Sequence, residues 1–194
     1  MQPFVHLHVH SQYSVLDGQA SVKALVDKAI ANGMRGIALT DHGNMFGIKE
    51  LTDYVNKKNK DVDGEIKNLK KTIEELKSAD AVDQEALSKA ETALKEAESK
   101  IFTPIIGCEM YVADNDMTDR SNKKDIGRHL IVLAKNQHGY HNLIKLVSNA
   151  WTDGYYYHPR TDKKQLASFL TGKQKPLAEI LLKEEDKNEN RRRT

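Results

Sequence analysis

The 194-residue chain has little cysteine and no long hydrophobic run. Its single cysteine, Cys108, excludes an internal disulfide framework and a metal site of the CxxC type, and it favours a reducing compartment. No stretch approaches the roughly 18 consecutive apolar residues that a membrane-spanning helix needs, and the first 30 residues lack the basic and apolar regions of a secretion signal. We therefore expect a cytoplasmic protein without a membrane partner.

A strong excess of charge of one sign is also missing. Thirty Lys and Arg residues face 28 Asp and Glu residues, which gives a net charge of +2. The chain as a whole is therefore not the basic body expected of a protein that binds duplex DNA by itself. With 39% hydrophobic and 30% charged residues, the composition suits one domain, alone or with an appendage. Eight histidines are the unusual component.

The first forty residues predict a strand, a helix and a second strand. Residues 4–10 alternate between aliphatic residues and histidines, which is typical of a strand. Apolar residues at helical spacing predict a helix over residues 21–32, with Ser21 as its N-cap and Gly33 as its stop. Residues 36–40 form a short apolar run that ends in a polar loop. Together these segments predict a βαβ unit, whose ligand sites lie at the carboxyl ends of the strands.

Residues 57–100 differ in character from the rest of the chain. They contain no proline or aromatic residue, and their apolar residues recur in two heptad blocks. The blocks are Ile66, Leu69, Ile73 and Leu76, then Leu87, Ala90, Leu94, Ala97 and Ile101. Residues 78–83 can turn the chain, with Asp83 capping the second helix. We predict an inserted antiparallel helical hairpin, which is either a solvated arm or a coiled coil that binds a partner.

After the hairpin the α/β pattern resumes, so residues 1–56 and 101–170 are predicted to form one domain around the 57–100 insertion. The patterns predict strands over 103–113 and 129–134, a helix over 140–151, a loop over 154–160 and a short helix over 162–170. Residues 171–194 end in a polar, charged run with too few apolar residues to pack, and we expect a divergent, disordered tail there.

Several histidines and carboxylates fall near the predicted strand ends. His8 and His10 are two apart on a strand, so they project from one face, as ligands of one metal or of adjacent metals do; two hydrogen-bonded sheet histidines would show the same pattern. Asp17 belongs to an Asp-Gly pair and is either a turn residue or a carboxylate placed over that strand end. His42 follows the second strand, with Asp41 as its support or as a cap.

The later strands add further candidates. Glu109 interrupts an apolar strand, where a carboxylate is costly unless it is paired or bound to metal, whereas Cys108 points to the opposite face as a small buried residue. His129 opens the next strand. Arg160, and less strongly Lys163, could hold a phosphate or be surface residues. Histidine and carboxylate ligands of this number suit a cluster of two or three Zn, Mn or Fe ions, and the implied reaction is phosphoester hydrolysis.

Six segments carry a resemblance to a known family. They are FVHLHVHSQYSVLDG at residues 4–18, GIALTDH at 36–42, PIIGCE at 104–109, HLIVLAKN at 129–136, YHNLIKLVS at 140–148 and GYYYHPR at 154–160. Outside the hairpin, residues 3–170 resemble the PHP (polymerase and histidinol phosphatase) domain, in the branch at the N-terminus of bacterial DNA polymerase III alpha subunits.

The resemblance implies a distorted (βα)7 barrel with a trinuclear metal site at its mouth. The matching positions make His8, His10, Asp17, His42, Glu109 and His129 the metal ligands, with Glu109 as a bridge. We expect Asp17, His42 and Glu109 to act in catalysis as well. The implied activity is metal-dependent 3′-5′ exonuclease chemistry in DNA replication, with DNA, the remainder of polymerase III and other replisome subunits as partners. Polymerisation, which uses Mg, belongs to regions much further along such proteins.

Two departures from this family pattern modify the expectation. A later small-residue or cysteine-containing strand and a final Asp-x-His motif are not found after Thr171, and His158 stands where a lysine is expected. We therefore expect a fragment with an incomplete barrel, an unpaired strand edge and no polymerase active site. The alternatives are an inactive scaffold module of the polymerase and a free-standing PHP phosphoesterase.

Overall fold

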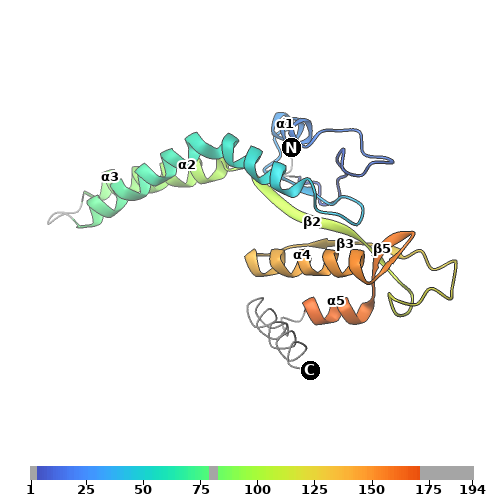
Figure 1. Ribbon diagram of the computed structural model, residues 1–194. Helices are drawn as coiled ribbons and strands as arrows, with labels where there is room; N and C mark the ends of the chain where they lie inside the picture. Colours follow the sequence, from blue (N-terminus) through green and yellow to red (C-terminus); the bar gives the residue numbers. More distant parts are fainter. Residues whose placement is uncertain (1–3, 79–82, 171–194) are drawn as a thin grey trace, which may run out of the picture.

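The computed structural model describes residues 4–78 and 83–170 (Figure 1). The tail predicted over residues 171–194 and most of the turn predicted over 78–83 lie outside these ranges. Within them the chain forms five helices and a sheet of parallel and antiparallel strands, so the mixed α/β class is confirmed. None of these helices has both the length and the apolar character required to cross a membrane.

The long strand β2 (Thr103–Val112) organises the sheet. Its first half pairs in parallel with β1 (Gly36–Leu39), and its second half pairs antiparallel with β3 (Arg128–Leu133). At its end, β2 pairs in parallel with β5 (His158–Thr161), which in turn pairs antiparallel with β4 (Tyr155–Tyr156). The parallel connection from β1 to β2 therefore runs through the helical hairpin.

Two predictions about local structure are wrong. Residues 4–10 run beside β1 but form no strand, because Val9 N–H donates to the Thr40 side chain at 2.9 Å and only two backbone bonds join the segment to its neighbour. Leu7 is consequently 51% exposed instead of facing a core. Residues 154–160 are not a simple loop, because Tyr157 adopts a φ of 57° and turns β4 back onto β5.

The first helix, α1 (Val22–Ala31), forms where the sequence predicts it. The Ser21 hydroxyl accepts a hydrogen bond from the Ala24 N–H at 3.2 Å, and Gly33 leaves the helix with a φ of 72°. Its buried face meets β1 and the start of α2 (Ile48–Ser78) in one apolar core. This core fixes the strand ends that carry the candidate site.

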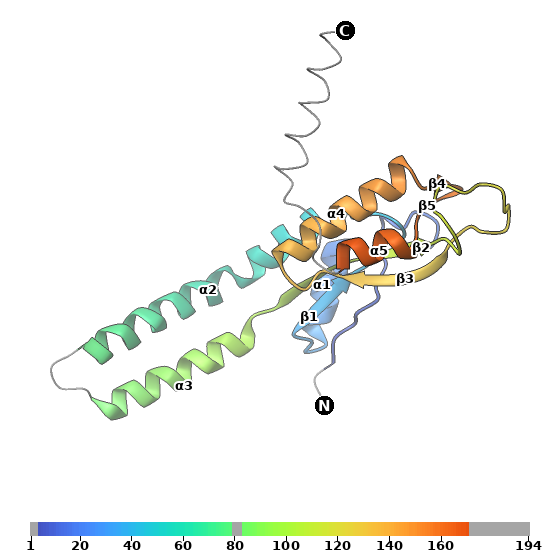
Figure 2. The same ribbon diagram turned by 90° about the horizontal axis from the view of Figure 1, so that it is seen from below.

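A helical hairpin lies in the part of the chain where the sequence predicts one. It consists of α2 and α3 (Gln84–Lys100), and Figure 2 shows the two helices side by side, extending away from the sheet. The Asp83 carboxylate caps α3 by accepting from two backbone N–H groups. Helix α2 begins at Ile48, before the predicted residue 57, so its first turns belong to the domain core through Leu51 and Val55.

Helices α4 (Gln137–Thr152) and α5 (Lys163–Leu170) cover the other side of β2, below the sheet in Figure 1. Cys108 and Met110 are fully buried against them, in a second core that includes Leu146 and Phe169. Because side chains alternate along a strand, the residue between these two, Glu109, must face away from α4 and α5.

Candidate metal centre

Glu109 lies at the centre of a cluster of imidazoles. It is 1% exposed, and its backbone is fixed in the sheet: its N–H donates to the Asp41 carbonyl at 3.1 Å, and its carbonyl accepts from Gly43 N–H at 2.8 Å. These bonds pair Glu109 with His42 in a parallel bridge that continues the line of β1 beyond its end. The carboxyl end of β1 and the middle of β2 therefore meet at one place.

Four imidazoles surround the Glu109 carboxylate. His8 Nε2 lies 2.6 Å and His10 Nε2 2.9 Å from Oε2, and these two nitrogens are 2.8 Å from each other. His42 Nδ1 lies 3.4 Å from the other oxygen, Oε1, and His129 Nδ1 also contacts Oε1. The ring nitrogens thus point at one buried carboxylate from three segments of the chain.

Asp17 joins the cluster from the exposed side. Its Oδ2 lies 2.8 Å from His42 Nε2, and its side chain is 58% exposed. The hydrogen bond with His42 holds the pKa of the Asp17 carboxyl below its usual value, so this group is ionised near neutral pH. Asp17 is thus placed as a carboxylate of the site in addition to being a turn residue.

The six predicted ligands form three overlapping groups in the described part of the chain. The groups are His8, His10 and Glu109; His10, Asp17 and His42; and His42, Glu109 and His129, and in each one the three ligand atoms lie within 4.8 Å of one another. His10, His42 and Glu109 each belong to two groups. A carboxylate can bridge two metal ions, so the membership of Glu109 in two groups is compatible with more than one ion.

Asp41 holds the loop that carries Asp17. Its buried carboxylate accepts from the Ser11 N–H at 2.7 Å, the Ser11 hydroxyl at 2.8 Å and the Ser14 hydroxyl at 2.7 Å. The Ser14 hydroxyl also lies 2.9 Å from His10 Nδ1 and so orients this imidazole. The sequence left open whether Asp41 supports the site or caps the next segment; these bonds place it in support. The two serines were not predicted, although both belong to the 4–18 motif.

Aromatic contacts close the site on the side of β5. Tyr111 follows Glu109 on the same face of β2, and its ring stacks on His158 with a centroid distance of 4.4 Å and an interplanar angle of 13°. Burial, together with His129 and His42 nearby, lowers the pKa of His158. Burial and Glu109 raise the pKa of Tyr111. His158 therefore lies beside the site. In the sequence it stands out only as a departure from the family pattern.

The predicted phosphate contact by Arg160 is wrong. Its side chain is fully buried, and its guanidinium donates to the carbonyls of Gly154 at 3.3 Å, Asp125 and Met117 at 2.8 Å, and Asp119 at 2.9 Å. The guanidinium N–H groups are occupied by these hydrogen bonds, most of which join residues 117–125 to β5. Arg160 thus stabilises the loop between β2 and β3 and has no face toward a substrate.

The donor set of the cluster fits divalent metal ions. His42 Nδ1 and Glu109 Oε1 are buried and make no hydrogen bond within the described residues, where their ion-pair contacts are with each other and, for Oε1, with His129 Nδ1. Imidazole nitrogen and carboxylate oxygen are ligands of Zn, Mn and Fe. Metal binding would satisfy both atoms and would offset the cost of burying a carboxylate.

Comparison with known proteins gives a family and a set of relatives. Residues 6–178 match the family model described as PHP domain, so the match runs beyond residue 170, where the resemblance seen in the sequence ends. The chain is 41% identical over 172 residues to the DNA polymerase III subunit alpha of Treponema pallidum, and 37% over 174 residues to that of Borreliella burgdorferi. Each alignment covers 87% of this chain and 11% of the relative, so the chain spans about a tenth of the length of these proteins.

Proposed function

The chain belongs to the PHP domain family, and on this premise we propose that its cluster binds two or three divalent metal ions and hydrolyses phosphoester bonds. The observation that carries the proposal is the environment of Glu109. Its buried carboxylate faces four imidazoles, and no lysine or arginine among the described residues pairs with it. Zn, Mn and Fe are the ions that suit these ligands.

Bound metal ions would polarise a phosphoryl oxygen and lower the pKa of a bound water. The residues of this chain supply the remaining functions. His8, His10, His42 and His129 would hold the ions around Glu109, which belongs to two of the ligand groups. Asp17 is exposed at the open side of the site and is held by His42 Nε2, so its carboxylate can orient a water there by accepting a hydrogen bond. Its lowered pKa makes it a weak base.

The polymerase setting is also a proposal. We propose that the chain is the PHP module of a bacterial DNA polymerase III alpha subunit, acting in the cytoplasm with DNA and other replisome subunits as partners. Its support is that the relatives from Treponema pallidum, Borreliella burgdorferi and Chlamydia pneumoniae, at 36–41% identity, are all DNA polymerase III alpha subunits. A 3′-5′ exonuclease reaction on DNA is the phosphoester hydrolysis that suits this setting. The parallel pairing of β2 with β1 and β5 is compatible with a PHP-type barrel.

Hydrolysis assays with two substrates test the proposal. The metal-loaded protein is incubated with 5′-labelled single-stranded DNA and, separately, with a small phosphomonoester. We expect shortening of the DNA from its 3′ end. The rate should fall roughly 100-fold or more in Glu109→Gln, since mutation of residues that only support a metal ligand already lowers activity about 10–100-fold. His138→Ala, a change at an exposed histidine outside the cluster, is the matched control. Hydrolysis of the monoester alone would support a free-standing phosphoesterase, and no hydrolysis by a metal-loaded protein would support an inactive scaffold.

A further inference from the structure

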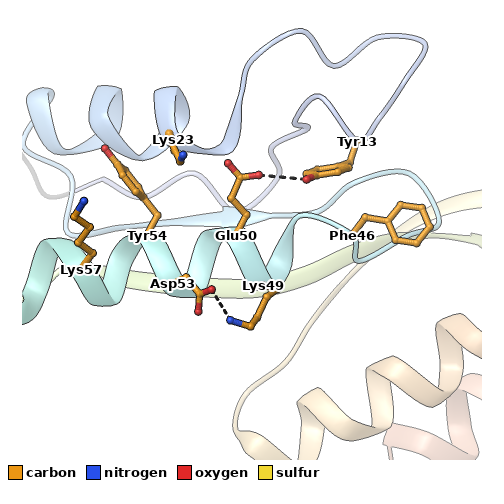
Figure 3. Close-up of a pocket in the computed structure, with 8 residues that line it drawn as sticks. All are labelled: Tyr13, Lys23, Phe46, Lys49, Glu50, Asp53, Tyr54 and Lys57. Atoms are coloured by element: carbon orange, nitrogen blue, oxygen red, sulfur yellow. Dashed lines mark hydrogen bonds and ion pairs between the residues drawn. The ribbon is translucent and has the colours of Figure 1, made fainter.

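A groove with aromatic walls lies outside the metal centre. It has a volume of about 580 Å³ and runs between α1, the loop after His10 and the first turns of α2. Tyr13, Phe46 and Tyr54 contribute rings to it, and three lysines and two carboxylates complete its lining. Figure 3 shows Phe46 at one end and Tyr54 near the other, with Tyr13 facing α2 from the loop above.

The rings differ in how much of their surface is open. Phe46 is 67% exposed, so most of its ring is open to solvent. Tyr13 is partly buried, and its hydroxyl donates to Glu50 at 3.3 Å. It packs over Gly47, where a Cβ would lie 3.0 Å from the ring. The Tyr54 ring is partly covered by the Lys58 ammonium at 5.1 Å. Phe46 is therefore the most open of the three rings.

The charges of the groove are unequal once their pairs are removed. The Asp53 carboxylate is paired with Lys49, and Glu50 accepts from Tyr13 (Figure 3). The side chains of Lys23 on α1 and Lys57 on α2 form no ion pair or hydrogen bond within residues 4–78 and 83–170. Glu50 keeps its negative charge, because the Tyr13 hydroxyl that donates to it is neutral. The unpaired charges of the lining are therefore two lysines and one carboxylate, and the net charge available to a ligand is positive by one.

We propose that this groove binds single-stranded DNA, with a base stacked on Phe46 and backbone phosphates at Lys23 and Lys57. Exposed aromatic faces together with unpaired cations are the features by which proteins bind single strands without reading their sequence, and a duplex keeps its bases stacked away from such a surface. An acidic peptide would satisfy the lysines but would leave the open ring without a planar partner.

The groove shares its two loops with the metal centre. Tyr13 lies in the segment that carries Ser14 and Asp17, and Phe46 follows His42 by four residues. The choice of DNA as the strand rests on the proposed function, but binding in the groove requires no metal ion. The two proposals therefore fail separately, because strand binding can be measured in EDTA and metal content without DNA.

Fluorescence anisotropy with a labelled 12-residue oligo(dT) in EDTA tests the proposal on the full chain. Phe46→Ala should weaken binding about 5- to 10-fold, at the low end of the effect of losing one base stack. Lys23→Gln with Lys57→Gln should reduce the slope of log affinity against log salt by about 1.4, since each phosphate contact to a single strand contributes about 0.7. Lys67→Gln with Lys95→Gln, which removes the same charge from the distant hairpin, should leave the affinity within about twofold.

Thermal unfolding of each variant shows whether the fold is retained, and all these positions are on the surface. Several outcomes would overturn the proposal: no binding of oligo(dT) by the wild type at low salt, an unchanged salt slope in the double lysine variant, or an equal effect of the hairpin variant. Displacement of oligo(dT) by poly-glutamate in wild type and Phe46→Ala alike would show that the groove is a docking site for acidic protein segments instead.

Discussion

Arg160→Ala should strongly destabilise the fold, because Arg160 is a buried structural residue. The substitution removes the donors of four backbone carbonyls and leaves a cavity between β5 and residues 117–125. Hydrogen bonds to charged groups and broken buried networks each cost several kcal/mol, so we expect a loss of about 3–5 kcal/mol in the free energy of unfolding. Arg128→Ala removes an exposed ion pair with Asp114 and should cost less than about 1 kcal/mol.

Urea unfolding followed by circular dichroism measures both variants. With a denaturant dependence of about 2 kcal/mol per molar, Arg160→Ala should lower the midpoint by roughly 1.5–2.5 M and Arg128→Ala by less than about 0.5 M. Arg160→Lys should fall between them, because it keeps the charge and loses the planar fork of donors, and it provides a measurement if the alanine variant does not fold. Equal midpoints for Arg160→Ala and Arg128→Ala would refute the structural role and return Arg160 to the candidates for phosphate binding.

Three further predictions concern single positions. Gly43→Ala should destabilise the protein by about 1–3 kcal/mol in thermal unfolding, because Gly43 has a φ of 58° and the new Cβ would lie 2.5 Å from Pro159 Cγ; an unchanged unfolding temperature would contradict this. Cys108, whose burial raises its thiol pKa to about 12, should react with iodoacetamide at pH 8 only after unfolding, and rapid labelling of the native protein would show that the second core is open. The hydrogen bond from Lys58 holds the pKa of the Asp27 carboxyl below 3.8, so the stabilisation from this bond is present above the unfolded pKa and is lost as pH falls through the folded pKa. Lys58→Ala should raise the pKa of Asp27 toward 3.8 in an NMR titration, and an unchanged pKa would exclude the bond.

Features set by local physics could be predicted from the sequence. The Ser21 and Asp83 caps act within a few residues of their own helices, and both are confirmed. The heptads of residues 57–100 predict the hairpin because each helix needs the other to bury its apolar stripe. The direction of Glu109 follows from strand alternation, with Cys108 buried on the opposite face. The six ligand positions that the motifs indicated also lie near one another in the structure.

Features set by distant contacts could not be predicted. The pattern of residues 4–10 is that of a strand, but the Thr40 hydroxyl takes the Val9 N–H that a ladder would use. Arg160 carries a charge that usually lies at the surface, and only the folding of residues 117–125 over it explains its burial. The left-handed backbone of Tyr157, which creates the β4–β5 turn, has no signal in residue type, because a tyrosine seldom adopts it.

Metal analysis of the purified protein tests the central claim most directly. Wild type, His42→Ala and the control His138→Ala are dialysed with Zn, Mn or Fe, separated from free ions and measured by elemental analysis. We expect about two or more equivalents in the wild type and in His138→Ala, and fewer in His42→Ala, because His42 belongs to two of the three ligand groups. Less than about a tenth of an equivalent in the wild type would show that these residues assemble no metal site, and the claim that Glu109 and its imidazoles form a metal centre would be wrong.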